Sequence, residues 1–244
     1  MKKNIAGIKS VERSARARRG QLALDLRSLP RWGGRRAGAG RKRGASPRIP
    51  HARRAPLDSR HPCHVTLKLR RGLPSLRSIL LVRELERSFR ETRDRRRGFR
   101  LVHYSFQHDH AHLIVEAANS LELASGMKSP GSRLSRAVNR VFRCRGAVLA
   151  DRFHVHVLRT PTEVRRAIAY VLLNARRHAA KLGRHLSRAP SVDPASSGRW
   201  FEGWRVPQRA AADAPAVAPP RTWVLRIGWR RAGRIDPGET PGGR

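Results

Sequence analysis

A run of apolar residues from Leu101 to Ala118 constrains this chain most, because nearly everything around it is rich in arginine. Strand-forming residues lead into the run and others lead out of it, and two histidines lie between them. This pattern predicts either two β-strands or one long bent strand. The prediction depends on Leu101, Val102, Tyr104 and Phe106 before the histidines, and on Leu113, Ile114 and Val115 after them.

His110 and His112 are two residues apart in this run, and the side chains of a strand alternate between its faces. Both imidazoles therefore point the same way, with Cα atoms about 6–7 Å apart, and could converge on one metal ion. His108 continues the same face if the strand is regular, whereas Asp109 and Ala111 point away. The chain has 11 histidines, so the alternative is a pair of half-buried or exposed side chains. A metal site needs further ligands elsewhere.

The charge of the chain favours a polyanionic partner. Its 244 residues carry 54 Lys and Arg against 17 Asp and Glu, which gives a formal net charge of +37. Phosphate contacts with nucleic acid would neutralise this charge. We expect no membrane association, because no apolar run reaches the length of a membrane span and the N-terminus lacks a signal-peptide core. Two cysteines make neither a metal pattern nor a disulfide framework. We expect a cytoplasmic, nucleoid-associated protein.

Three regions differ in composition. Residues 1–60 hold many arginines and few bulky apolar residues, so we expect a disordered basic arm. Residues 61–185 carry the periodic apolar patterns of a folded domain. Residues 186–244 form an Arg/Pro-rich tail that we also expect to be disordered. Its tryptophans lie in two clusters, which either stack on unpaired bases or pin the tail to the folded body.

The arm contains a short basic segment, Gly40–Gly44, whose cations are Arg41, Lys42 and Arg43. Glycine-flanked arginines of this kind can enter a narrow minor groove of DNA. The alternative is a solvated tail that touches phosphates anywhere. Either way, these three residues are predicted to bind DNA.

The order of expected elements is β-α-β-β-α-β followed by a helix, which is the plan of an α+β, ferredoxin-like fold with an antiparallel four-stranded sheet. In such a sheet the first and third strands are central, so the histidine strand should lie in the middle. The expected elements are a strand at 64–69, a helix begun by Ser75 and ending near Arg95, the two strands of the apolar run, a helix begun by Asn119 or Ser120 and interrupted at 129–132, a strand at 148–160, and a last helix from Pro161 to Leu182.

The last helix brings a second set of polar side chains. Tyr170 and Asn174 are four residues apart and share one stripe, which Arg177 and His178 extend. This stripe borders the apolar one that should face the core, formed by Val164, Ile168, Val171, Ala175, Ala179 and Leu182. Tyr104, the only other tyrosine, lies inside a strand and is expected to be structural.

These residues resemble the single-tyrosine HUH transposases, the insertion-sequence type that includes the REP-associated tyrosine transposases. The resemblance covers about residues 61–185 and depends on His110 and His112 in the expected strand and on Tyr170 and Asn174 in the late helix. It implies that His110, His112 and Asn174 bind a divalent metal ion and that Tyr170 is the catalytic nucleophile. Two features depart from the family: Asp109 stands where relatives commonly have Asn, and Pro130–Gly131 interrupts a helix.

The resemblance further implies a metal-dependent single-stranded DNA endonuclease and strand-transferase that acts in DNA transposition. A nitrogen and oxygen ligand set suits Mg²⁺ or Mn²⁺, with Zn²⁺ possible. The expected partners are single-stranded DNA with hairpins, contacted by Arg176 and Arg177, and a second copy of the chain. The alternative is a non-catalytic, domesticated DNA-binding protein of the same fold. A replication initiator ranks below both, because the chain has no phosphate-binding loop of a helicase.

Overall fold

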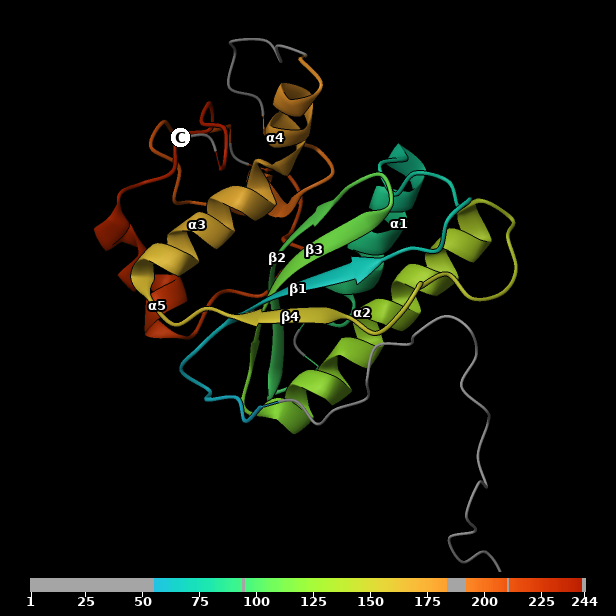
Figure 1. Ribbon diagram of the computed structural model, residues 1–244, viewed down its shortest axis with the longest axis horizontal. Coiled ribbons are helices and arrows are strands. Elements are labelled where there is room, and N and C mark those ends of the chain that lie inside the picture. Colours follow the sequence, from blue (N-terminus) through green and yellow to red (C-terminus); the bar gives the residue numbers. More distant parts are fainter. Residues whose placement is uncertain (1–54, 94, 184–191, 210, 243–244) are drawn as a thin grey trace, which may run out of the picture. The chain divides into compact units, whose positions relative to one another are not determined.

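Four antiparallel strands form the centre of the fold (Figure 1). The computed structural model describes residues 55–93, 95–183, 192–209 and 211–242, so the predicted arm with Arg41, Lys42 and Arg43 lies outside the described residues. The strand order is β2-β3-β1-β4. This is the ferredoxin-like order, with the histidine strand in the middle, and the predicted α+β fold is confirmed. The strands are β1 (Cys63–Lys68), β2 (Phe99–Phe106), β3 (His110–Ala117) and β4 (His154–Val157).

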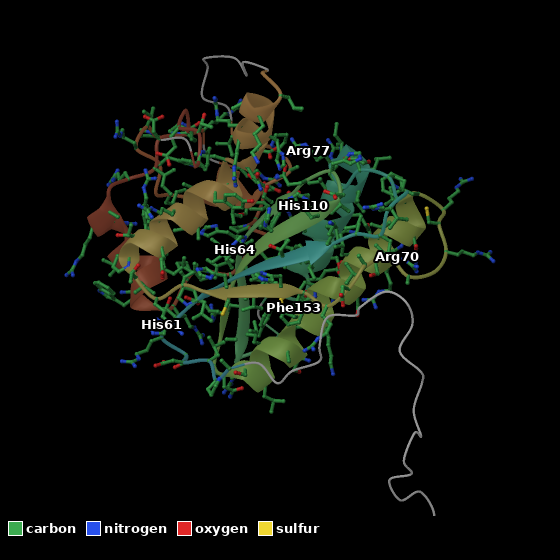
Figure 2. All side chains as sticks on the ribbon, viewed as in Figure 1. His61, His64, Arg70, Arg77, His110 and Phe153 are labelled. Carbon is green, nitrogen blue, oxygen red and sulfur yellow. The ribbon has the colours of Figure 1, made fainter. Side chains whose placement is uncertain are left out.

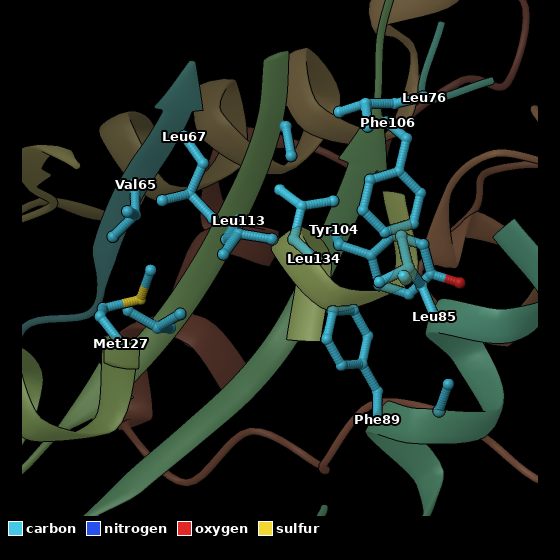
Figure 3. Packing of buried hydrophobic residues seen from close by; sticks show 14 of the residues in the cluster. Val65, Leu67, Leu76, Leu85, Phe89, Tyr104, Phe106, Leu113, Met127 and Leu134 are labelled. Carbon is cyan, nitrogen blue, oxygen red and sulfur yellow. The ribbon is translucent and has the colours of Figure 1, made fainter. Parts of the chain in front are cut away.

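The two faces of the sheet differ in chemistry because the side chains alternate. On β1, Cys63, Val65 and Leu67 are buried, whereas His64 and Thr66 on the other face are partly exposed. The buried face packs against two helices, α1 (Ile79–Arg90) and α2 (Ser120–Val141) (Figure 1). Figure 3 shows the core between them, where Leu, Val and Met side chains meet a group of aromatic rings. The polar side chains of β1 therefore lie on the face of the sheet opposite α1 and α2.

The first helix begins later than predicted. Its N-cap is Ser78, not Ser75, and it ends at Arg90, before Arg95. Ser75 instead makes a local turn, in which its hydroxyl accepts a hydrogen bond from the Arg77 backbone N–H. The predicted apolar stripe is confirmed, since Leu81, Val82, Leu85 and Phe89 are all buried.

The predicted interruption of the next helix is wrong. Helix α2 begins at Ser120, capped by the Asn119 side chain, and runs through Pro130 without a break. Proline removes one backbone hydrogen bond and crowds the preceding turn. Packing compensates, because large apolar residues before and after Pro130 are buried against the sheet; they are Leu123, Met127, Leu134 and Val138.

A third helix, α3 (Pro161–Leu172), covers the opposite face of the sheet (Figure 1). Pro161 takes the first helical position as predicted, and the Thr160 and Glu163 side chains each accept a hydrogen bond from the other's backbone N–H. The helix does not continue to Leu182. The backbone at Leu173 (φ −110°, ψ 17°) leaves the helical region, and a second helix, α4, runs over Asn174–Lys181.

This break redirects the chain. Leu182, predicted to face the core, is 70 % exposed, and only the α3 part of the apolar stripe is buried. No helix among residues 55–93, 95–183, 192–209 and 211–242 combines the length and the apolar character needed to cross a membrane.

The C-terminal region is ordered, so the expectation of a disordered tail is wrong for residues 192–209 and 211–242. It contributes a short helix, α5 (Trp223–Arg226), and two 3₁₀ turns, η1 (Ser197–Trp200) and η2 (Gly228–Ala232). Trp204, Trp229 and Ile235 are buried with α3 and the sheet residue Ile114 in a second core. The tryptophans thus pin this segment to the body, one of the two alternatives above.

Buried polar groups strengthen the attachment. The Glu116 carboxylate accepts hydrogen bonds from the backbone of Arg221 and Thr222 and from the Thr222 hydroxyl. The Tyr104 hydroxyl donates to Glu86, which also receives two hydrogen bonds from Arg199. Burial raises the pKa of Tyr104 far above its usual value. Tyr104 is therefore a core residue, as the sequence predicted.

His103 makes the stability of this attachment pH-dependent. The side chain is buried beside Phe201, and burial lowers its pKa from 6.5 to about 4. The unfolded chain binds this proton below pH 6.5 and the folded chain only near pH 4, so stability falls as pH drops through that window. A pKa lowered from 6.5 to about 4 corresponds to roughly 3 kcal/mol of stability at pH 7 relative to pH 4.

We expect chemical denaturation to show this loss between pH 7 and pH 4. The His103→Gln variant, which has no titrating ring, should lose about 3 kcal/mol less than the parent over the same window. Equal pH slopes for the two proteins would contradict the assignment.

Candidate active site

His110 and His112 lie on β3 at the middle of the sheet and face α3. Strand β3 pairs with β1 so that His112 is opposite Thr66 and His110 is opposite Lys68. The two imidazole rings are 4.6 Å apart between centroids and nearly perpendicular, at 79°. His112 is buried and His110 is partly exposed. The predicted convergence of the two rings on one face is confirmed. Figure 2 labels His110 at the start of this strand and His64 on the neighbouring β1.

His108 does not extend the pair, contrary to the expectation for a regular strand. It lies in the turn between β2 and β3, where its carbonyl accepts a hydrogen bond from the Leu76 backbone N–H. The chain reverses direction at this turn, and strand alternation begins only at His110.

Each histidine of the pair has a partner on Nδ1. The Asp109 carboxylate is 2.7 Å from His110 Nδ1, and this hydrogen bond lowers the pKa of Asp109. His112 Nδ1 is 3.1 Å from His64 Nε2 and 3.2 Å from the Thr66 hydroxyl. An ionised carboxylate only accepts hydrogen bonds, so a neutral His110 carries its proton on Nδ1. Partners of this kind fix the tautomer and orientation of metal-binding histidines. The atom that would bind a metal ion is then Nε2 of each ring, which on His112 lies 3.4 Å from the Tyr170 hydroxyl oxygen.

His112 and His64 are neutral at pH 7. Burial lowers the pKa of His112 to about 3 and that of His64 to about 4, and nearby cationic groups add to the effect. The neighbours of His112 include His110, His178 and Arg177, and those of His64 are His156 and His154. Neutral imidazole is the form that binds a metal ion.

Tyr170 reaches this histidine pair from α3. Its hydroxyl oxygen is 3.4 Å from His112 Nε2, and the two rings are 5.0 Å apart between centroids. The Arg177 guanidinium lies 4.8 Å from the centre of the Tyr170 ring. The His178 ring lies 5.9 Å from that of His110. Tyr170, Arg177 and His178, which the sequence placed on one stripe, therefore all lie beside the histidine pair.

Asn174 is the first residue of α4 and is fully buried. Neither atom of its amide group has a hydrogen-bond partner, including any from the histidines. A buried amide without partners costs about 1–3 kcal/mol. Such a group is expected where a ligand completes the site, and its Oδ1 atom is of the type that a divalent ion accepts.

The donors present fit a divalent metal ion if Asn174 takes part. Within the part of the chain that the structure describes, no three His, Cys, Asp or Glu side chains are grouped so that they could hold a metal ion. Two imidazole nitrogens and the unpaired amide of Asn174 supply the mixed set that suits Mg²⁺ or Mn²⁺. The third ligand would be the Asn174 Oδ1 atom, which is buried and has no hydrogen-bond partner.

A cavity of about 810 Å³ opens beside Tyr170. It is bounded by α3, by His64 and His156 on neighbouring strands, and by residues 239–242 near the C-terminus. Arg165 lines it and forms two hydrogen bonds of 2.7 Å with Glu239, which ties these residues to α3. Arg166 lines the cavity and is exposed. Tyr170 therefore lies at the wall of a space that could receive part of a substrate.

His64 is a site residue that the sequence analysis did not single out. Its Nε2 atom contacts His112 Nδ1, and its ring lies 5.6 Å from the Tyr170 ring. We expect the His64→Leu variant to bind Mn²⁺ about 10–100-fold more weakly, because the His112 ring then loses a hydrogen-bond partner that holds its orientation. Calorimetric titration measures this directly.

The matched variant is Thr66→Val, which removes the other partner of His112 Nδ1. A loss in His64→Leu that exceeds the loss in Thr66→Val identifies His64 as the positioning residue. Unchanged Mn²⁺ affinity in His64→Leu would contradict its role. Arg176 is partly buried on α4, and its predicted contact with DNA stays a prediction.

Comparisons with known proteins add a fold-level likeness. No protein-family model matches this chain, and no curated protein matches it significantly. Among solved structures, a REP-associated tyrosine transposase bound to a REP hairpin is similar over 53 % of this chain and 74 % of that one. The two are 16 % identical with a TM-score of 0.41. At this level the likeness carries no argument about activity, which has to come from the site.

Proposed function

We propose that this protein is a metal-dependent, single-stranded DNA endonuclease and strand-transferase of the transposase type, with Tyr170 as its nucleophile. One observation carries the proposal: the Tyr170 hydroxyl oxygen is 3.4 Å from His112 Nε2, inside the group formed with His110, His64 and Arg177. A group of imidazoles and one guanidinium around a partly exposed phenol matches the needs of nucleophilic catalysis.

The chemistry is a balanced exchange of phosphodiester bonds. The Tyr170 oxygen attacks a backbone phosphorus, forming an O–P bond to the protein, and the bond from phosphorus to the 3′-oxygen breaks. The phenol gives up its proton and the departing 3′-oxygen takes one, so no water and no cofactor are consumed. A 3′-hydroxyl can later reverse the reaction and join two strands.

Each residue has a stated task in this step. His110, His112 and Asn174 would hold a divalent ion, which when bound supplies positive charge to the non-bridging oxygens. Asp109, His64 and Thr66 hold the two imidazoles in orientation. The guanidinium of Arg177 lies over the phenol ring and would attract the phosphate that the Tyr170 oxygen attacks.

The substrate follows from charge and geometry. The net charge of +37 favours DNA phosphates, and we propose that the cavity next to Tyr170 receives part of an unpaired strand. One tyrosine handles one strand at a time, so transposition of an element with two ends calls for two copies of the chain. We therefore propose a homodimer as the acting form.

Incubation with labelled single-stranded hairpin DNA tests the proposal. In the presence of Mn²⁺, the full chain should form a protein–DNA adduct that survives denaturation in detergent, and a free 3′-hydroxyl should appear on the released strand. Chelation of the metal should abolish both. DNA binding without an adduct under any divalent ion would leave the alternative of a non-catalytic DNA-binding protein.

A further inference from the structure

The proposed cleavage contains one proton transfer to which no residue has yet been assigned. As the bond from phosphorus to the 3′-oxygen breaks, that oxygen gains negative charge and has to take up a proton. An alkoxide is a poor leaving group, and a positioned side chain that donates the proton typically accelerates such a step about 10²–10⁴-fold. Histidine exchanges a proton near neutral pH, so a histidine in the cavity beside Tyr170 could supply it.

His156 is an exposed histidine in the wall of this cavity. It lies on β4, which forms one edge of the sheet (Figure 1). Its partner in the pairing of β4 with β1 is His64, and residues opposite each other in an antiparallel pair project from the same face, with Cβ atoms about 4.5–5.5 Å apart. The His64 ring lies 5.6 Å from the Tyr170 ring. An imidazole accessible to solvent therefore neighbours the side chain that contacts the proposed nucleophile.

The position of His156 suits the departing oxygen better than the attacking one. In phosphoryl transfer the attacking and departing oxygens lie roughly in line with phosphorus. Tyr170 belongs to α3 and His156 to β4, so the two side chains come from different walls of the cavity. The Tyr170 hydroxyl oxygen is 3.4 Å from His112 Nε2 on β3. A phosphate in this cavity can therefore meet Tyr170 on one side and His156 on another.

The other histidines near the site are less suited to donate a proton. His64 also lines the cavity, but burial lowers its pKa to about 4, so it is neutral at pH 7. Its Nε2 atom is also already in contact with a second imidazole. His178 lies against His110, with 5.9 Å between ring centroids, and is outside the described walls of the cavity. His154 is exposed on the same face of β4 but is likewise outside these walls.

A carboxylate near His156 favours its protonated form. The titratable and charged side chains that share the cavity wall with His156 are His64 on β1, Glu163, Arg165, Arg166 and Tyr170 on α3, and Glu239 near the C-terminus. Arg165 and Glu239 form a salt bridge with each other, which leaves the Glu163 carboxylate and the exposed Arg166. The pKa of Glu163 is lowered, first by a hydrogen bond from the Arg159 backbone N–H, and positive charge on His156 adds to this effect. By the same interaction Glu163 stabilises the imidazolium.

We propose that His156 donates the proton to the departing 3′-oxygen and accepts it again when a 3′-hydroxyl rejoins the strand. In cleavage, the bond from the Tyr170 oxygen to phosphorus forms, the bond to the 3′-oxygen breaks, and one proton passes from the His156 imidazolium to that oxygen. The phenol proton passes to water. In rejoining, neutral His156 takes the proton of the attacking 3′-hydroxyl, and the Tyr170 oxygen leaves and regains a proton from water. The inference rests on the proposed function and assigns one of its steps.

A substrate that needs no proton donor tests this role. In hairpin DNA with sulfur in place of the bridging 3′-oxygen, the departing group is a thiolate, which is far more stable near neutral pH than an alkoxide. On ordinary DNA, with saturating protein and Mn²⁺, we expect His156→Gln to form the adduct at least about 10²-fold more slowly than the parent. On the sulfur-substituted DNA the two rates should agree to within about threefold. An equal loss on both substrates would overturn the proposal, because a residue that only positions DNA is needed for both.

The pH dependence of adduct formation gives a second readout. On ordinary DNA the rate of the parent should stop rising with pH near neutrality, because the gain in phenolate is offset by the loss of protonated His156. The rate of His156→Gln should go on rising, since only the ionisation of the phenol then remains. Parallel pH profiles for the two proteins would contradict the assignment.

The matched control is His154→Gln, which removes an exposed imidazole two residues away on the same strand. It should keep the rate of the parent on both substrates, and a loss as large as that of His156→Gln would overturn the proposal. If the parent forms the adduct and His156→Gln forms it equally fast on ordinary DNA, this inference alone fails. If the parent forms no adduct with either DNA, the proposed function fails together with it.

Discussion

The Tyr170→Phe variant should form at least about a thousandfold less covalent protein–DNA adduct than the parent protein. The substitution removes one oxygen and keeps the ring that contacts His64, His112 and Arg177. That oxygen is the atom 3.4 Å from His112 Nε2, and removal of a nucleophile in other enzymes costs several powers of ten in rate. Denaturing gel electrophoresis of labelled hairpin DNA with Mn²⁺ measures the adduct.

Two controls locate the effect at the oxygen. Tyr170→Phe should bind the same hairpin with the affinity of the parent, because its net charge is unchanged. Tyr104→Phe changes the other tyrosine, which is fully buried with its hydroxyl on Glu86; it should lose stability but keep adduct formation in the folded fraction. An adduct in Tyr170→Phe would refute the assignment.

The sequence predicted the central sheet because its signals are local. Alternation of apolar residues marks β1 and β3, and the Thr160–Pro161 start of α3 has its own capping residues. Once β3 is central, a single helix packed on its polar face brings Tyr170 to the histidine pair. The sequence was therefore enough to predict that Tyr170 and the histidine pair lie close together.

What the sequence did not predict depends on contacts between distant residues. His64 reaches His112 only through the pairing of β1 with β3, which no local pattern encodes. The helix break at Leu173 could not be predicted from a local signal, because neither glycine nor proline is present there. Pro130, by contrast, predicted a break that does not occur, because packing against the sheet keeps α2 continuous.

The order of the C-terminal segment was not predicted, for a related reason. Its Arg- and Pro-rich composition is typical of a disordered chain, yet a few large side chains suffice to attach it to the body. Trp229 is 2 % exposed and packs with Phe201, at 5.4 Å between ring centroids, in the core that also contains Val164 and Ile168 of α3. Because α3 carries Tyr170, the geometry of the candidate site depends on this segment.

Trp229→Ala should therefore lower the free energy of unfolding by about 3–5 kcal/mol, the usual cost of removing a large buried aromatic side chain. Trp223→Ala, in the same segment, should cost less than about 1 kcal/mol, because Trp223 is 48 % exposed. Urea denaturation monitored by circular dichroism measures both. If Trp229→Ala were as stable as Trp223→Ala, the C-terminal segment would not be part of the folding unit. The large loss, in turn, would mean that residues 61–185 alone cannot hold α3 against the sheet, and that the candidate site exists only in a chain that retains its C-terminal residues.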